Sequence, residues 1–389
     1  MVFNTIKDFL SASSQAAALK EKCGDIVFYA EGTHDWPFIG PLIQSLAEKT
    51  KHKLTYLTSD RHDPFLQKKT SQCKSYYIGS GAVRDNVLRH IDTKIIVMTL
   101  ADLDNMRIKR SVHPVHYVYI FHSLNSTHMV YRKGAFDAYD TIFCPTPYHI
   151  REIRAHEEQN HLQKKNLVKY GYPLLENLMN KAALHENLTD VQQVSPKILI
   201  APSWGVGSLV DENHIEEIVS TLLNANFEVI LRLHPMSLRH HQKRIQQWEN
   251  DFGEMGRFEV DRDISSNDAF FTADILLSDW SGAAYEFAYV RERPVIYIDT
   301  PPKVHNPDWQ SLNIRPFEMT VRNTLGQCLA PQNIKNLPET IADLLEQHSS
   351  FREEISTLRE RNVFNMGKSV EVGLKAILDI YRTIEESNS

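Results

Sequence analysis

Residues 276–299 read LLSDWSGAAYEFAYVRERPVIYID, and this stretch decides the class of fold. An apolar run at Ile275–Leu277 leads into a polar turn of small residues, and Tyr285–Val290 then shows a helical pattern. After Pro294 a second apolar run begins at Val295–Ile298. The order strand, turn, helix, strand is typical of a parallel β-sheet. A helix that starts directly after a strand presents backbone N–H groups that suit a phosphate, although an ordinary crossover helix with a capped end fits the same pattern.

The same alternation extends along the chain in both directions. Further strands are predicted at Ile26–Ala30, Lys53–Leu57, Lys94–Met98, His116–Phe121, Asp140–Cys144, Lys197–Ala201, Glu228–Leu233 and Arg257–Val260. Helical patterns lie between them, including Trp36–Lys49 and the highly polar stretch Ala155–Lys165. Strands that alternate with helices predict an α/β protein with mainly parallel sheets.

The length of 389 residues exceeds one compact core and predicts two domains of about 150–200 residues each. We place the boundary in the polar stretch His185–Pro196. The expected domains are residues 1–190 and 191–370, with a final helix at 371–389 that packs back on the N-terminal domain. Two doubly wound sheets leave a cleft between them, and such sheets bind ligands beyond the carboxyl ends of their strands.

Composition excludes several classes of protein. A formal net charge of −6 gives no support for general nucleic-acid binding. The four cysteines lack paired spacing, which indicates a reducing compartment and argues against a zinc knuckle or a disulfide framework. The sequence shows neither a signal peptide nor an apolar stretch of about 18 residues, so we predict a cytoplasmic protein.

An apolar helical face near the N-terminus leaves two placements open, contact with the inner face of the cell membrane and packing on its own domain. The small, polar residues of Ser11–Ala18 make a weak anchor and favour the second placement. The face consists of Phe3, Ile6, Phe9 and Leu10.

Polar residues follow four of the predicted strands. They are His122, Ser203, His234 and Asp279. Because the carboxyl ends of parallel strands lie at one edge of a sheet, we expect these residues to face the cleft. A histidine at a strand end can act as a general base or donate a hydrogen bond to a phosphate, and we assign catalytic roles to His122 and His234.

A second set of residues is predicted to bind the substrate or nucleotide. Ser203, Trp204 and Gly205 open a glycine-rich loop that lets the backbone approach a phosphate. Arg232 is placed to reach either an anion or a structural carboxylate, and we favour the carboxylate. The remaining members come from the opening stretch: Ser278, Asp279, Ser281, Gly282 and Glu286.

Several common cofactor sites are missing from the sequence. The glycine-rich loop lacks the Gly-Lys-Ser/Thr ending of a Walker loop, and no Gly-x-Gly-x-x-Gly occurs. His113, His116 and His128 match no usual spacing of metal ligands. We therefore predict no metal and no cofactor.

The ordered set of motifs resembles the CDP-glycerol:poly(glycerophosphate) glycerophosphotransferases, which build teichoic acids and related capsule polymers. The motifs span roughly residues 115–300 and are Phe121-His122-Ser123, Gly171-Tyr172-Pro173, Ala201-Pro202-Ser203-Trp204-Gly205, Leu233-His234-Pro235, Ser278-Asp279-Trp280-Ser281-Gly282 and Arg293-Pro294-Val295-Ile296. Each motif alone is weak, whereas their order is fairly specific.

The resemblance implies a GT-B fold, with two Rossmann-like domains that hold the acceptor and the donor. It implies metal-independent transfer of glycerol- or ribitol-phosphate from a CDP-activated donor to a glycan or lipid-linked acceptor. His122 then takes the place of the base and His234 that of the histidine near the donor phosphates. Ser281 and Gly282 meet the diphosphate, and Glu286 stands where many GT-B proteins hold a ribose.

The chain departs from the family motifs at three positions. Ser123 replaces a glycine, Gly205 an arginine, and Gly282 the second serine of a pair. These departures keep open a GT-B glycosyltransferase that uses a nucleotide-sugar in capsule or lipopolysaccharide synthesis. Two further alternatives are a non-catalytic binding protein and a nucleotide-sugar 2-epimerase, whose acidic groups would be Glu31, Asp102 and Asp104.

Overall fold

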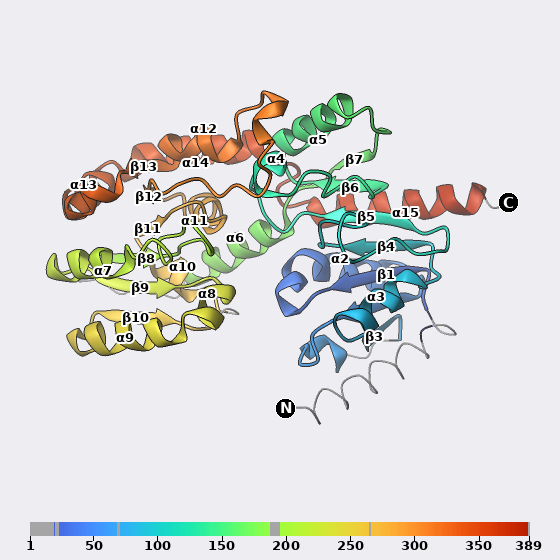
Figure 1. The fold of residues 1–389 in the computed structure, drawn as a ribbon, viewed down its shortest axis with the longest axis horizontal. Coiled ribbons are helices and arrows are strands. Elements are labelled where there is room, and N and C mark those ends of the chain that lie inside the picture. Colours follow the sequence, from blue (N-terminus) through green and yellow to red (C-terminus); the bar gives the residue numbers. More distant parts are fainter. Residues whose placement is uncertain (1–18, 20–22, 68–70, 187–194, 264–265, 388–389) are drawn as a thin grey trace. The chain divides into compact units, whose positions relative to one another are not determined.

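The computed structural model describes residues 19, 23–67, 71–186, 195–263 and 266–387 (Figure 1). The apolar face predicted from Phe3, Ile6, Phe9 and Leu10 lies outside these residues. The chain forms two compact units. Unit 1 takes the described residues of Met1–Ser123, Tyr131–Leu174 and Val363–Ser389, and unit 2 takes those of Leu124–Val130 and Leu175–Asn362.

The described part of unit 1 is built on a seven-stranded parallel sheet in the order β3-β2-β1-β4-β5-β6-β7. Ile26 pairs with Leu54 on one side and with Ile95 on the other. The chain therefore winds outward from β1 to β3 and restarts on the opposite side of β1, which puts the topological switch between β1 and β4. The strands are β1 (Ile26–Ala30), β2 (Leu54–Thr58), β3 (Cys73–Tyr77), β4 (Ile95–Met98), β5 (His116–Ile120), β6 (Thr141–Cys144) and β7 (Asn166–Lys169).

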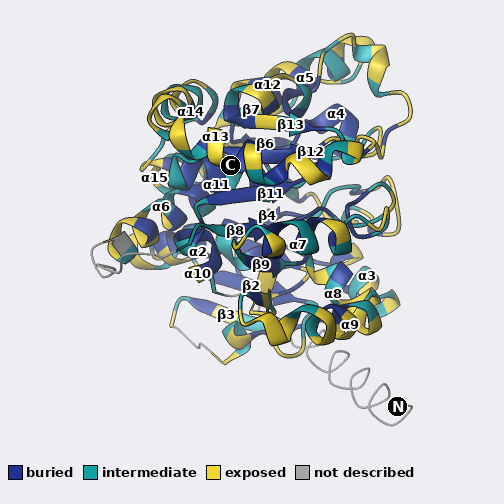
Figure 2. Cartoon of the chain, turned by 90° about the vertical axis from the view of Figure 1, so that its left-hand side faces the viewer, coloured by how far each residue is buried: buried dark blue, intermediate teal, exposed yellow. Residues whose placement is uncertain are grey.

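Helices surround this sheet, and its central strands are buried (Figure 2). Burial on both faces explains why β1 (IVFYA) and β4 (IIVM) are continuous apolar runs instead of alternating ones. The helical elements of unit 1 are η1 (Thr33–Asp35), α2 (Trp36–Lys49), η2 (Pro64–Leu66), α3 (Ala82–Arg89), α5 (Pro147–Gln159) and α15 (Ser369–Ser387).

The C-terminal segment is part of unit 1. The hydroxyl of Tyr381 on α15 lies 2.8 Å from Nζ of Lys94 and 3.2 Å from Oδ2 of Asp25. Lys94 directly precedes β4, and Asp25 directly precedes β1. Ahead of the helix, the amide of Phe364 donates to the carbonyl of Pro145 at 2.9 Å. These contacts attach the end of the chain to strands formed far earlier in the sequence.

The described part of unit 2 holds a six-stranded parallel sheet in the order β10-β9-β8-β11-β12-β13. Ile198 of β8 pairs with Val229 and with Ile275, so the switch in winding direction lies between β8 and β11. The strands are β8 (Lys197–Ile200), β9 (Glu228–Arg232), β10 (Phe258–Asp261), β11 (Ile275–Ser278), β12 (Val295–Ile298) and β13 (Gly326–Leu329).

Unit 2 has helices along most of Leu175–Asn362, and one more helix comes from its separate segment Leu124–Val130. The amide of Ser126 in that segment donates to Oε2 of Glu318 at 3.1 Å, and its hydroxyl donates to Oε1 at 2.9 Å. The helical elements are α4 (Thr127–Val130), α6 (Pro173–Glu186, in unit 2 from Leu175), α7 (Ile215–Asn224), α8 (Pro235–His240), α9 (Gln242–Phe252), η3 (Gly253–Met255), α10 (Asp268–Thr272), α11 (Ala283–Arg291), η4 (Trp309–Leu312), α12 (Phe317–Leu325), η5 (Pro331–Asn336), α13 (Leu337–Glu346) and α14 (His348–Asn362).

The predicted α/β class with parallel sheets is confirmed, but the helix predicted at Ala155–Lys165 is wrong in position. The helix α5 starts eight residues earlier, at Pro147, and ends at Gln159. Its start is set by Thr146, whose hydroxyl accepts from the amide of His149 at 3.2 Å, and by the proline in the first turn.

The sequence analysis also missed three strands, β3, β7 and β13. Each of them is an edge strand of its sheet. Their sequences, CKSYY, NLVK and GQCL, carry polar or small residues where a central strand is apolar. Edge strands face solvent along one side and do not need an apolar run, so periodicity does not detect them.

Candidate functional site

Asp279 organises the switch point of unit 2. It follows β11 and is buried. Its Oδ1 accepts from the amide of Ser203 at 2.7 Å and from that of Trp280 at 2.6 Å, and its Oδ2 accepts from the amide of Leu209 at 3.0 Å. The carboxylate thus fixes both ends of the loop from Ser203 to Leu209 to the end of β11.

The two predicted serines beside this carboxylate are buried. The hydroxyl of Ser278 donates to the carbonyl of Ala201 at 2.7 Å, which joins the ends of β11 and β8. Ser203 is also buried and uses its backbone amide to bind Asp279. Ser278 and Asp279 therefore shape the loop, whereas the residues after Ser203 are the ones that project from it.

The loop beyond Ser203 is partly exposed, most of all at Val206, and glycine-dependent. Gly205 and Gly207 have φ values of +89° and +84°, which L side chains rarely adopt. A Cβ on Gly205 would meet no atom within 4 Å, so the backbone conformation is what requires glycine there. The amide of Ser208 donates to the carbonyl of Gly205 at 3.0 Å and closes the turn. This backbone is open to a ligand.

His234 follows β9, and its ring lies beside that of Trp204. The two rings are stacked, with centroids 5.5 Å apart and planes at 26°. Nδ1 of His234 accepts from the amide of Met236 at 3.1 Å. An acceptor nitrogen carries no hydrogen, so the neutral imidazole is protonated on Nε2. His234 is therefore set up as a hydrogen-bond donor through Nε2–H.

Arg232 binds a carboxylate of its own unit. Its guanidinium forms an ion pair with Asp261 on the neighbouring strand β10 and lies 3.4 Å from the carbonyl of Asp263. The side chain also stacks over Phe270. The carboxylate that sequence analysis favoured as its partner is thus Asp261.

Ser281 and Gly282 precede α11. The hydroxyl of Ser281 accepts from the amide of Ala283 at 3.3 Å, and the carbonyl of Gly282 accepts from the amide of Tyr285 at 3.1 Å. Glu286 lies in the first turn and is half-buried. The nine residues of α11 direct the positive end of the helix dipole at Gly282.

His122 lies after β5 in unit 1, at the edge that carries the switch between β1 and β4. Its Nδ1 is 3.2 Å from the carbonyl oxygen of Thr99, which follows β4. A carbonyl can only accept, so Nδ1 carries a hydrogen, and in the neutral imidazole Nε2 then keeps its lone pair. His122 therefore has the tautomer of a general base, which is the reverse of His234.

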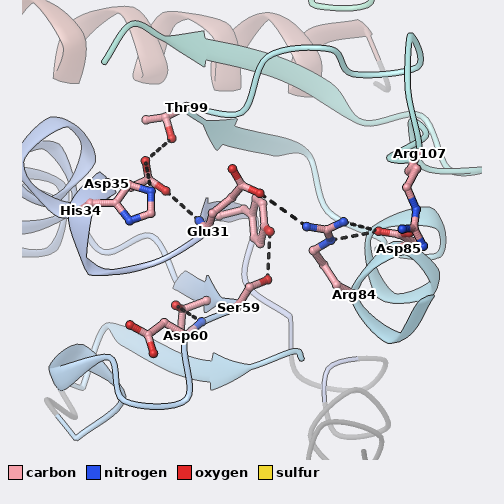
Figure 3. A network of polar contacts seen from close by, with 11 residues as sticks. Glu31, His34, Asp35, Ser59, Asp60, Arg84, Asp85, Thr99 and Arg107 are labelled. Carbon is pink, nitrogen blue, oxygen red and sulfur yellow. Dashed lines mark hydrogen bonds and ion pairs between the residues drawn. The ribbon is translucent and has the colours of Figure 1, made fainter. Parts of the chain in front are cut away.

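The buried carboxylate of Asp35 is linked to His122 through Thr99. The hydroxyl of Thr99 donates to Oδ1 of Asp35 at 2.8 Å, and the amide of Glu31 donates to Oδ2 at 2.7 Å (Figure 3). His122 is itself exposed, yet the surrounding protein removes part of its solvation and lowers its pKa. The charge of Asp35 and the hydrogen bond to Thr99 oppose this change.

A family model matches the part of the chain that holds Ser203, His234 and Asp279. The model of the CDP-glycerol:poly(glycerophosphate) glycerophosphotransferases matches residues 126–321, which is half of the chain. The chain belongs to this family. It is a transferase of the kind that moves glycerol phosphate from CDP-glycerol to a poly(glycerophosphate) acceptor. No curated protein matches the chain in sequence.

Solved structures share the fold of this chain. The wall teichoic acid polymerase TagF has a TM-score of 0.62 at 14% identity, over 100% of this chain and 99% of that one. UDP-GlcNAc 2-epimerase from Neisseria meningitidis, bound to UDP-GlcNAc, has a TM-score of 0.55 at 13% identity, over 91% and 99%. These likenesses and the two doubly wound sheets confirm the predicted GT-B fold.

The acidic groups that an epimerase would use bind other groups of this chain. Glu31 lies 3.5 Å from the guanidinium of Arg84, which also binds Asp85 (Figure 3). Asp102 pairs with Arg132 at 2.9 Å. Oδ1 of Asp104 accepts from the amide of Arg110 at 2.8 Å. Burial, and then the charge of Asp35, raise the pKa of Glu31.

Two observations bear on metals and membranes. Within the described ranges, no three His, Cys, Asp or Glu side chains come together as a possible metal site. In the same part of the glycerophosphotransferase, no helix combines the length and the apolar character that crossing a membrane requires.

Proposed function

We propose that unit 2 binds the CDP-activated donor and that unit 1 binds the acceptor and supplies the base. The opposite tautomers of the two histidines carry this proposal. Nε2 of His122 has the lone pair that accepts a proton, and Nε2 of His234 has the hydrogen that a phosphate oxygen accepts.

In the proposed reaction, the oxygen of an acceptor hydroxyl attacks the β-phosphorus of CDP-glycerol or a related CDP-polyol. The bond between that phosphorus and the bridging oxygen breaks, and CMP leaves with the electron pair. The hydroxyl proton passes to Nε2 of His122. Positioning and electrostatic stabilisation account for most catalysis of such transfers, so the donor-holding groups matter as much as the base.

The donor-holding groups are proposed from the switch point of unit 2. The loop at Trp204 and Gly205 and the start of α11 at Ser281 and Gly282 offer backbone N–H groups to the diphosphate. Glu286, one turn into α11, is proposed to bind the ribose. Arg232, Ser278 and Asp279 are proposed to hold these elements in place through the contacts described above.

Cytoplasmic location and peripheral contact with the membrane are proposed as well. Cys23, Cys73, Cys144 and Cys328 are all free thiols, which fits a reducing compartment. The acceptor is proposed to be a glycan or lipid-linked polymer. Flotation of the protein with anionic vesicles tests the membrane contact, and a protein that stays at the bottom of the gradient would contradict it.

The test of the proposed function combines donor binding with transfer. CDP-glycerol or CMP should raise the melting temperature more than UDP or GDP. His122→Ala should lower kcat by about 10²- to 10⁴-fold, the usual contribution of a general base, and keep the donor-induced stabilisation. His234→Ala should lose both transfer and part of that stabilisation.

His113→Ala is a matched control, because His113 is exposed in the same unit as His122. Preferential stabilisation by UDP would refute a cytidine donor. Unchanged turnover of the His122 variant would refute the assignment of the base.

A further inference from the structure

Lys303 lies beside the proposed donor site although sequence analysis did not single it out. It follows β12 in an irregular segment, and its side chain is half-buried. Nζ of Lys303 lies 4.7 Å from the centroid of the Trp204 ring, the ring on which His234 also stacks. A cation at this distance from an indole is attracted to the ring. The Trp204 ring, just after β8, thus contacts both Lys303 and His234.

The segment that carries Lys303 is fixed in place at two further points. The indole N–H of Trp280, directly after Asp279, donates to the carbonyl of Thr300 at 2.8 Å. Pro301 packs on the loop, because a Cβ on Gly207 would lie 3.4 Å from its carbonyl oxygen. Lys303 is therefore positioned by the same elements that shape the glycine loop.

The charge of Lys303 is weakly balanced by its surroundings. Burial is the main influence on its pKa and lowers it, and the opposing influence comes from Asp279. The Asp279 carboxylate is already bound by three backbone amides. In the part of the chain that the structure describes, Lys303 forms no ion pair with a carboxylate. An anion bound here would supply the missing negative charge.

We propose that Lys303 binds a phosphate of the donor, with His234 as its companion on the Trp204 ring. This inference rests on the proposed function, in which unit 2 binds a CDP-activated donor. A phosphate accepts charge-assisted hydrogen bonds from an ammonium group. Negative charge accumulates on CMP as the bridging bond breaks, so the same lysine stabilises the leaving group.

Isothermal titration of CMP, CDP-glycerol and cytidine into variants of the full chain tests the inference. Lys303→Met should weaken binding of CMP and CDP-glycerol about 10- to 100-fold, the loss expected for one hydrogen bond to a charged group. Binding of cytidine, which has no phosphate, should be unchanged. Lys303→Arg retains the positive charge and its attraction to the Trp204 ring, and should keep most of the affinity.

Lys197→Met is the matched control. Lys197 is the first residue of the central strand β8, so it lies at the amino ends of the strands and away from the proposed donor site. It pairs with Glu228 at 3.4 Å near the surface. The substitution Lys197→Met removes the same charge from unit 2, and we expect it to leave the nucleotide affinity unchanged. Raising the salt concentration should weaken CMP binding more in the native protein than in Lys303→Met.

The outcomes separate the two proposals. If the native protein binds CMP and Lys303→Met binds it as tightly as Lys197→Met does, the role of Lys303 is wrong and the proposed function stands. If the native protein binds no cytidine nucleotide, the proposed function itself fails. Lys303→Gln repeats the measurement should the methionine variant melt at a lower temperature.

Discussion

Replacing Asp279 with asparagine should destabilise unit 2 far more than loss of one surface charge would. The amide oxygen can still accept from Ser203 and Trp280, but the new NH2 group faces the amide of Leu209. That buried N–H is left unpaired at a cost of about 1–3 kcal/mol, and each remaining bond loses about 1 kcal/mol because its acceptor is no longer charged. The total is about 3–5 kcal/mol.

Tryptophan fluorescence measures this loss directly. Four of the five tryptophans belong to unit 2: Trp204, Trp248, Trp280 and Trp309. At about 2–4 °C per kcal/mol for a domain of this size, the melting temperature should fall by about 10 °C. Asp251→Asn is the control, since Asp251 is exposed on α9 and its loss should change stability by less than about 0.5 kcal/mol.

An Asp279→Asn protein that melts with the control would refute the reasoning, because three short bonds to one carboxylate would then contribute nothing. Donor affinity should fall together with stability. The carboxylate positions the loop that is proposed to bind the diphosphate, so the two losses have one cause.

Two further predictions concern the loop and the base. Gly205→Ala should weaken donor binding and destabilise unit 2 by about 1–2 kcal/mol, because alanine disfavours a φ of +89° even where its Cβ has room; an unchanged urea midpoint would contradict this. Asp35→Asn removes a charge that raises the pKa of His122, so that pKa should fall. Since the base acts when neutral, the acidic limb of the pH profile of kcat/KM should move to lower pH. An acidic limb at the same pH would show that Asp35 does not influence the pKa of the base.

Sequence periodicity predicted the central strands well and, of the edge strands in the described sheets, only β10. The core strands β1 and β12 match their predicted ranges because burial on both faces demands continuous apolar residues. The strands β3, β7 and β13 were missed because an edge strand needs no such run. The helix predicted at Ala155–Lys165 was misplaced because polar composition was weighed more heavily than the Thr146-Pro147 start signal.

The roles of the candidate site residues stay predictions, and only some of these residues have a signal in the sequence. Residues next to apolar runs, such as His122, His234 and Asp279, follow from the rule that ligands bind beyond strand ends. Asp35 and Thr99 follow from the same rule applied to β1 and β4, but a threonine and an aspartate there look like ordinary loop residues. Lys303 gives no local signal, since only folding brings it to Trp204.

The path of the chain through its two units has a consequence for folding during synthesis. Unit 1 is assembled from three separate segments, and Val363–Ser389 is the last of them. The bonds from Tyr381 to Lys94 and Asp25 cannot form until α15 has left the ribosome. Unit 2, although later in sequence, has all of its residues by Asn362. We therefore expect unit 2 to be complete before unit 1, which can finish folding only once Val363–Ser389 has emerged from the ribosome.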